Sequence, residues 1–126
     1  MKNSKKIVLV VEDEKSLLNA AKLKLEKAGM EVWGASRVDE ALKIIKNKKK
    51  VDVIWLDHYL LGDKNGLDFV VKVKGEAAWK KIPIFLISNT ATTDKIDSYL
   101  RLGIHKYYTK SNLKLDDIVA EIKSLK

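Results

Sequence analysis

The chain has 126 residues, 46% of them hydrophobic, which suits one well-packed domain and is too short for two ordinary ones. It contains no cysteine, so disulfides and thiolate metal sites are excluded. Lys and Arg outnumber Asp and Glu by 25 to 17, a formal net charge of +8, but the basic residues are spread over the whole chain, so nucleic-acid binding by this domain alone is not expected.

No apolar stretch approaches the ~20 residues that a membrane span requires. The basic residues 1–6 lead into a short apolar run that ends before Glu12, which is not the pattern of a signal peptide. We therefore expect a cytoplasmic protein that does not contact a membrane.

Short apolar runs alternate with longer stretches of helical periodicity along the chain. This alternation is typical of repeated strand–helix units, which form a parallel sheet covered by helices. The predicted strands lie near residues 6–12, 31–35, 52–57, 83–88 and 106–109. The predicted helices lie near residues 15–28, 38–47, 66–74, 93–102 and 115–125. The sequence thus predicts a single α/β domain over residues 1–126, with five parallel strands and five helices.

The helical segments carry apolar faces and recognisable ends. Gly29 offers a left-handed stop to the first helix. The second can be capped by Ser36 or Asp39, and the lysine-rich segment 46–50 is typical of a helix C-terminus, where cations suit the helix dipole. In the fourth helix, the residues expected to face inward are Ile96, Tyr99, Leu100 and Leu102.

Five side chains outside these apolar faces are assigned no chemistry. Trp33, Trp55 and Trp79 are interpreted as packing residues, since no aromatic spacing suggests stacked bases. His58 and His105 have no partner at a metal-ligand spacing, and both are interpreted as exposed or loop residues.

Five polar residues fall at the carboxyl ends of predicted strands, where loops and helix N-termini of an open parallel sheet converge and ligands bind. They are Glu12, Asp13, Asp57, Ser88 and Lys110. Each alone has an ordinary interpretation, as a helix cap, a turn residue or a surface lysine. The five together predict a site.

The chemistry of that site follows from its charges. Three crowded carboxylates repel one another unless one is protonated or a cation neutralises them. Oxygen ligands without His or Cys favour Mg²⁺, which takes one or two carboxylates from a protein and keeps several waters. With Lys110 as a fixed positive charge and Ser88 as a hydroxyl donor, the arrangement suits phosphoryl transfer to or from Asp57, whose carboxylate can form an aspartyl phosphate.

An ordered set of motifs covers essentially the whole chain. Its parts are Val10-Val11-Glu12-Asp13-Glu14, Asp57, Gly66-Leu67-Asp68-Phe69, Pro83-Ile84-Phe85-Leu86-Ile87-Ser88, Gly103 and Tyr107-Tyr108-Thr109-Lys110. In this order and spacing the chain resembles the CheY-like receiver domains of two-component response regulators. The resemblance implies a flavodoxin-like, doubly wound sheet with the strand order 2-1-3-4-5.

The resemblance also implies roles for individual residues. Asp57 would be the phosphoacceptor, and Glu12 and Asp13 would form the acidic pocket, with Asp13 the direct Mg²⁺ ligand. Asp57 itself and the backbone carbonyl of Tyr59 would complete the protein ligands of the metal.

A signalling switch would follow from the same resemblance. Lys110 would pair with the phosphoryl oxygens, Ser88 would move to bind one of them, and Tyr107 would swing inward when Ser88 moves. The phosphoryl group would come from a histidine kinase or a phosphotransfer protein. A downstream protein would read the surface of the fourth helix, fifth strand and fifth helix.

The chain departs from the family pattern in four places. Asn89 stands where Ala or Gly is usual, and Ser111 replaces the proline that commonly follows the lysine, so the cis peptide of that turn is not expected. The loop 57–66 is one residue longer than usual and has Leu61 in place of a proline. Tyr59 is bulky at a position that could screen an acyl phosphate from water. Because no reactive group is lost, we expect the domain to be phosphorylated. We expect the phosphorylated form to hydrolyse slowly, because Tyr59 and Asn89 could both crowd the path of an attacking water.

Two other functions are weighed. One is a phosphorylation-independent, receiver-like interaction module with a degraded switch, which Asn89 and Ser111 favour. The other is a phosphatase or phosphotransferase acting on an external substrate, which would need a carboxylate at the position of Tyr59. The chain is therefore expected not to be an enzyme in the ordinary sense, although it would catalyse its own phosphorylation and dephosphorylation.

Overall fold

The computed structural model describes residues 5–47, 50–89, 92–112 and 114–125. Five strands and five helices alternate within these ranges. The strands are β1 (Ile7–Val11), β2 (Glu31–Ala35), β3 (Val53–Leu56), β4 (Ile84–Ser88) and β5 (Lys106–Thr109). The helices are α1 (Lys15–Lys27), α2 (Val38–Asn47), α3 (Gly66–Lys74), α4 (Thr93–Arg101) and α5 (Leu115–Ser124), with a short 3₁₀ turn at Lys110–Asn112. Residues 48–49 of the lysine-rich segment and residues 1–4 lie outside the described parts.

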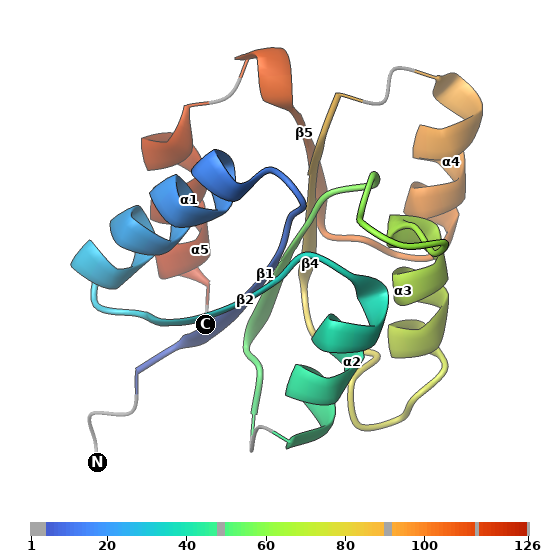
Figure 1. The fold of residues 1–126 in the computed structure, drawn as a ribbon, viewed down its shortest axis with the longest axis horizontal. Helices are drawn as coiled ribbons and strands as arrows, with labels where there is room; N and C mark the ends of the chain where they lie inside the picture. The colour runs from blue at the N-terminus through green and yellow to red at the C-terminus, as the bar shows by residue number, and fades with distance from the viewer. Residues whose placement is uncertain (1–4, 48–49, 90–91, 113, 126) are drawn as a thin grey trace.

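The five strands form one parallel sheet in the order β2-β1-β3-β4-β5. Helices α1 and α5 cover one face, and α2, α3 and α4 cover the other (Figure 1). The predicted doubly wound architecture and strand order are confirmed. The order reverses between β1 and β3, so the loops that follow these two neighbouring strands diverge and leave a crevice at their carboxyl ends.

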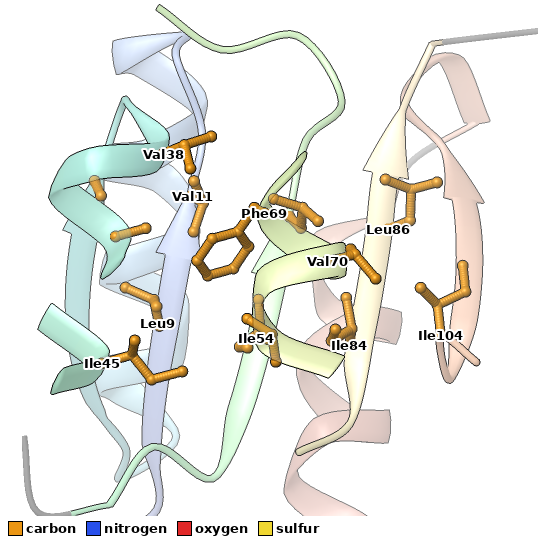
Figure 2. Close-up of a cluster of buried hydrophobic side chains, with 14 of the residues drawn as sticks. Leu9, Val11, Val38, Ile45, Ile54, Phe69, Val70, Ile84, Leu86 and Ile104 are labelled. Carbon is orange, nitrogen blue, oxygen red and sulfur yellow. The ribbon is translucent and has the colours of Figure 1, made fainter. Parts of the chain in front are cut away.

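The central strands are buried on both faces, which explains why they read as continuous apolar runs. On the α2, α3 and α4 face, Leu9, Ile54 and Ile84 lie under Phe69 and Val70 of α3 (Figure 2). On the α1 and α5 face, the core is built from residues one position out of step along the same strands. It includes Val8, Val10, Val53, Trp55, Phe85 and Ile87.

Local sequence signals fix most helix ends. Gly29 and Gly103 have φ angles of 91° and 89°, in the left-handed region that glycine adopts without steric cost. Asn65 caps α3 through a reciprocal pair of hydrogen bonds with Asp68. Thr92 occupies the N-cap of α4 without a side-chain hydrogen bond to the helix.

Two predictions about side chains are wrong. Trp33 lies on the edge strand β2, is 37% exposed, and donates its indole N–H to the Glu31 carboxylate at 2.6 Å. Leu100 is 54% exposed because α4 buries a narrower stripe, centred on Tyr99, than its periodicity predicts. Trp55 is fully buried and Trp79 packs against the core, as expected. No helix in the described ranges is long and apolar enough to cross a membrane.

Candidate functional site

The sheet places the predicted acidic residues together. The Asp57 amide donates to the Val11 carbonyl at 2.9 Å, so Asp57 lies beside the end of β1, where Glu12 follows. Carboxylate oxygens of Glu12, Asp13 and Asp57 all lie within 4.8 Å of one another. Glu12 and Asp57 are buried, whereas Asp13 is nearer the solvent.

Lys110 reaches this cluster from the end of β5. Its Nζ lies 3.0 Å from Glu12 Oε2, 3.0 Å from Asp57 Oδ2 and 3.7 Å from Glu14 Oε1. The Lys110 side chain is only 14% exposed, so these charge-assisted bonds are poorly screened by solvent. One ammonium group therefore bridges carboxylates carried by two neighbouring strands.

The site holds more negative charge than Lys110 can neutralise. Burial, followed by repulsion from Asp57, raises the pKa of Glu12 from 4.5 to about 8. Burial opposes the charge of Lys110, but its hydrogen bonds to Asp57 and Glu12 outweigh that penalty and raise its pKa. In the absence of a metal, Glu12 is thus mostly protonated at neutral pH.

Two oxygens of the cluster lack a partner. Within the part of the chain that the structure describes, Glu12 Oε1 and Asp57 Oδ1 are buried and accept no hydrogen bond. Unpaired buried oxygens are costly, and they are common where an ion binds. Glu12, Asp13 and Asp57 offer the closely spaced, oxygen-only ligands that Mg²⁺ prefers, so this donor set fits that ion.

The other two residues of the predicted switch lie on the neighbouring strands. Ser88 is fully buried at the end of β4, paired in register with Thr109 of β5. Tyr107 is partly buried against the core, and its hydroxyl lies 3.4 Å from the Ser88 backbone carbonyl. That distance is long for a hydroxyl hydrogen bond, so the contact holds the ring weakly.

The residues directly after Asp57 contact α4. Tyr59 is 52% exposed, and its hydroxyl accepts a hydrogen bond from Lys95 Nζ at 3.0 Å.

The interpretation of His58 as an exposed or loop residue is wrong. Its side chain is buried, and its Nδ1 lies 2.6 Å from the Tyr99 hydroxyl. Burial lowers the pKa of His58 and raises that of Tyr99, so both are neutral at pH 7.

Sequence reasoning missed His58, although a signal for its burial was present. Ile54 and Leu56 face the α3 side of the sheet, and continuing that alternation places residue 58 on the same face. A histidine buried there needs a polar partner. Tyr99, one of the residues expected to face inward, supplies it.

The departures from the family pattern occupy the loops around the site. The Asn89 side-chain oxygen accepts a hydrogen bond from the Ser111 backbone amide at 3.0 Å, and the described residues contain no cis peptide bond. In the longer loop, the Leu61 amide donates to the Ser36 carbonyl at 3.0 Å, which attaches this loop to the one after β2. The substituted positions therefore have partners of their own.

A surface pocket of about 370 Å³ opens beside Lys110. Residues from the loops after β1 and β4, from the first turn of α1 and from the turn after β5 line it. They are Glu14, Ser16, Leu17, Asn89, Lys110 and Ser111. A ligand that approached the cluster from this side would meet the Lys110 ammonium group.

Comparison with known families gives one match over most of the chain. The family model for the response regulator receiver domain matches residues 8–123. Among curated proteins, the transcriptional regulatory protein DltR of Streptococcus agalactiae is 34% identical over 116 residues, which cover 92% of this chain and 50% of that protein. The chemotaxis protein CheY1 of Helicobacter pylori is 29% identical over 104 residues, 82% of this chain and 83% of that protein.

The phosphate regulon transcriptional regulatory protein PhoB of Pseudomonas aeruginosa is 28% identical over 120 residues, 95% of this chain and 51% of that protein. The chain thus spans about half the length of two of these relatives.

Solved structures agree with the sequence matches. A CheY-like receiver domain protein from Methanospirillum hungatei superimposes with a TM-score of 0.86 at 25% identity, covering 95% of this chain and 92% of that one. The phosphorylated cyanobacterial phytochrome response regulator RcpA gives a TM-score of 0.81 at 25% identity, covering 95% and 90%.

Proposed function

Because the chain belongs to the response regulator receiver domain family, whose members are signalling switches, we propose that Asp57 accepts a phosphoryl group in a Mg²⁺-dependent reaction. The observation that supports this most directly is the state of the Asp57 carboxylate. One of its oxygens accepts a hydrogen bond from Lys110. The other is buried near Glu12 and has no hydrogen-bond partner among the described residues. A carboxylate held in this way is aligned for reaction and only partly neutralised.

The proposed donor is the phosphohistidine of a histidine kinase or of a phosphotransfer protein. A carboxylate oxygen of Asp57 attacks phosphorus, the new O–P bond forms, and the P–N bond to the imidazole breaks with its electron pair returning to the ring. Lys110 and the Ser88 hydroxyl bind the phosphoryl oxygens, where negative charge develops. Hydrolysis later releases inorganic phosphate and restores the carboxylate.

Glu12, Asp13, Asp57 and the Tyr59 carbonyl are the residues proposed to hold the metal. When bound, Mg²⁺ supplies positive charge to the phosphoryl oxygens. Without metal the pKa of Glu12 is about 8, so Glu12 carries a proton at neutral pH. It must lose this proton before all three carboxylates can act as metal ligands.

The proposed output is a change in the surface of α4, β5 and α5, driven by Ser88 and Tyr107. Glu121 of α5 binds Lys106 at 2.9 Å and also accepts a hydrogen bond from Tyr108, so β5 and α5 are held together. A movement at the end of β5 would therefore be passed to α5. A downstream protein would bind this surface according to how well it complements the shape and charge of the surface.

Incubation with acetyl phosphate and Mg²⁺, followed by intact mass measurement, tests the proposal. We expect one phosphoryl adduct on the parent chain, none in Asp57→Asn, and an undiminished adduct in Asp63→Asn, which changes an exposed carboxylate of the same loop. Absence of the adduct, under conditions that modify another receiver domain, would support the phosphorylation-independent interaction module instead.

A further inference from the structure

His58 joins the phosphoacceptor loop to α4 through a buried hydrogen bond. His58 is 3% exposed and Tyr99 is fully buried, and the two are 41 residues apart in the chain. Their polar atoms lie 2.6 Å apart and their rings meet edge to face at 82°. The function proposed above uses neither side chain.

The backbone of the acceptor is enclosed by the same contact. The Gly66 amide donates to the His58 carbonyl at 2.8 Å. A methyl group added at Gly66 would collide with the Tyr99 hydroxyl and would lie 2.8 Å from the Asp57 carbonyl oxygen. The peptide between Asp57 and His58 and the Tyr99 hydroxyl thus both pack against Gly66, where there is no room for a side chain.

A second contact with α4 lies one residue further along. Lys95 Nζ donates to the Tyr59 hydroxyl and lies 5.0 Å from the centre of its ring. This pair is exposed, so competition from solvent and the loss of side-chain entropy reduce its contribution to stability. The buried pair differs because removing one partner leaves the other as a desolvated polar atom without a hydrogen bond, which is energetically costly.

We propose that Tyr99 is a positioning residue for Asp57, acting through His58, and that this contact couples the state of the acceptor to α4. The inference rests on the proposed function of Asp57 as phosphoacceptor. It adds a connection that does not pass through Ser88 or Tyr107, because those residues lie on β4 and β5.

The physical argument is one of alignment. The Asp57 carboxylate must face Lys110 and the metal pocket at the same time, and His58 is covalently attached to its backbone. If the Tyr99 hydroxyl is removed, the imidazole loses its buried partner and the peptide can shift. Small misplacements of a reacting group lower rates by up to about a hundredfold.

Coupling of this kind is reciprocal. If phosphorylation or metal binding at Asp57 moves the peptide, the bond from His58 transmits that movement to Tyr99 and α4. A protein that binds α4 in one position would, through the same hydrogen bond, alter the affinity of the Asp57 pocket for Mg²⁺ by the same factor.

Four variants separate this role from simple packing. Tyr99→Phe removes only the hydroxyl, His58→Leu removes only the imidazole, and their double variant leaves an apolar pair. Lys95→Met is the matched control, since it removes a polar group of the same helix that contacts the same loop at an exposed site. For each we would measure the adduct rate against acetyl phosphate concentration, the Mg²⁺ dissociation constant by calorimetry, and unfolding in urea.

We expect Tyr99→Phe to lower the maximal phosphorylation rate by about three- to tenfold and to weaken Mg²⁺ binding by a similar factor, with the half-saturating donor concentration little changed. The double variant should show a phosphorylation rate and a Mg²⁺ affinity close to those of each single variant, because all three remove the same hydrogen bond. Lys95→Met should change either quantity less than twofold.

Reduced stability of Tyr99→Phe with an unchanged rate and unchanged Mg²⁺ affinity would overturn the inference and leave a packing role. If the parent forms no adduct, the proposed function fails, and Mg²⁺ affinity alone decides the positioning role. Equal affinity in the parent and Tyr99→Phe, or no Mg²⁺ binding by either, would then overturn it.

Discussion

The side chain of Asn89 accepts a hydrogen bond from the backbone amide of Ser111 at 3.0 Å. This hydrogen bond links the residue after β4 to the turn after β5, next to Lys110 in the chain. Both residues depart from the family pattern, and the two departures are complementary. A proline at 111 would have no amide to donate, and an alanine at 89 would have no acceptor to offer.

The first prediction concerns this bond. Asn89→Ala should lower the free energy of unfolding by about 0.5–1.5 kcal/mol, as expected for one net hydrogen bond. Asn89→Asp retains an acceptor and should cost less. Urea unfolding measures the stability, and hydrogen exchange of the Ser111 amide reports the bond directly. Equal exchange rates in the parent and Asn89→Ala would contradict the prediction.

Glu12 predicts a pH dependence of the metal-free protein. Its pKa is about 8 when folded and 4.5 ordinarily, so between these values the folded state binds a proton that the unfolded state has lost. The contribution of Glu12 to stability is therefore full below about pH 4.5 and is lost as pH rises toward 8, by at most about 1.4 kcal/mol per pH unit. Urea unfolding in EDTA should show this fall, and Glu12→Gln should lack it.

Lys110→Met should separate phosphoryl transfer from metal binding. The variant removes the ammonium group that lies 3.0 Å from both Glu12 and Asp57. We expect the rate of adduct formation with acetyl phosphate to fall by about tenfold to a hundredfold. Mg²⁺ affinity should not fall, since a competing cation has been removed. Lys114→Met, at an exposed lysine nearby, serves as the control, and an equal loss of rate there would refute the assignment.

Gly66→Ala should be destabilising because its new methyl group meets the Tyr99 hydroxyl and the Asp57 carbonyl. Overpacking of this kind costs about 1–3 kcal/mol. Adding Tyr99→Phe should recover part of that cost, because the hydroxyl is one of the two obstacles. Urea midpoints of the single and double variants measure both effects. A double variant less stable than the sum of the two changes would speak against this packing.

The lifetime of the phosphorylated form is the last prediction. We expect slow hydrolysis, because Tyr59 and Asn89 could both crowd the path of an attacking water. Tyr59→Asn and Asn89→Ala should each shorten the lifetime severalfold when the decay of the adduct is followed by mass. If both variants lose phosphate at the parent rate, crowding is not the cause.

The fold and the grouping of the site residues were predictable from the sequence because strand ends are strong local signals. Asp57 follows an apolar run and Lys110 follows the short run Tyr107-Tyr108-Thr109, and parallel strands bring such ends to one edge. The contacts of His58 were not predictable in the same way. Its partner is carried by a helix that begins 35 residues later, and only the packing of α4 against α3 brings the two together.

Leu100 shows a second limit of the sequence. The periodicity of α4 includes this residue in the apolar stripe, yet its side chain is largely exposed while Tyr99 is fully buried. Periodicity gives the direction of an apolar face but not its width, which depends on how closely the neighbouring elements approach.

The order in which the residues of the acidic pocket occur along the chain has a consequence for folding during synthesis. Glu12 and Asp57 are made first, and the cation that bridges them is 98 and 53 residues further on. Until β5 is in place, the two carboxylates lack the Lys110 ammonium group, so only a proton on Glu12 or a bound cation can relieve their repulsion. A chain truncated before β5 would carry the acceptor without its counter-charge, so the full rate of phosphoryl transfer would be reached only after β5 has joined the sheet.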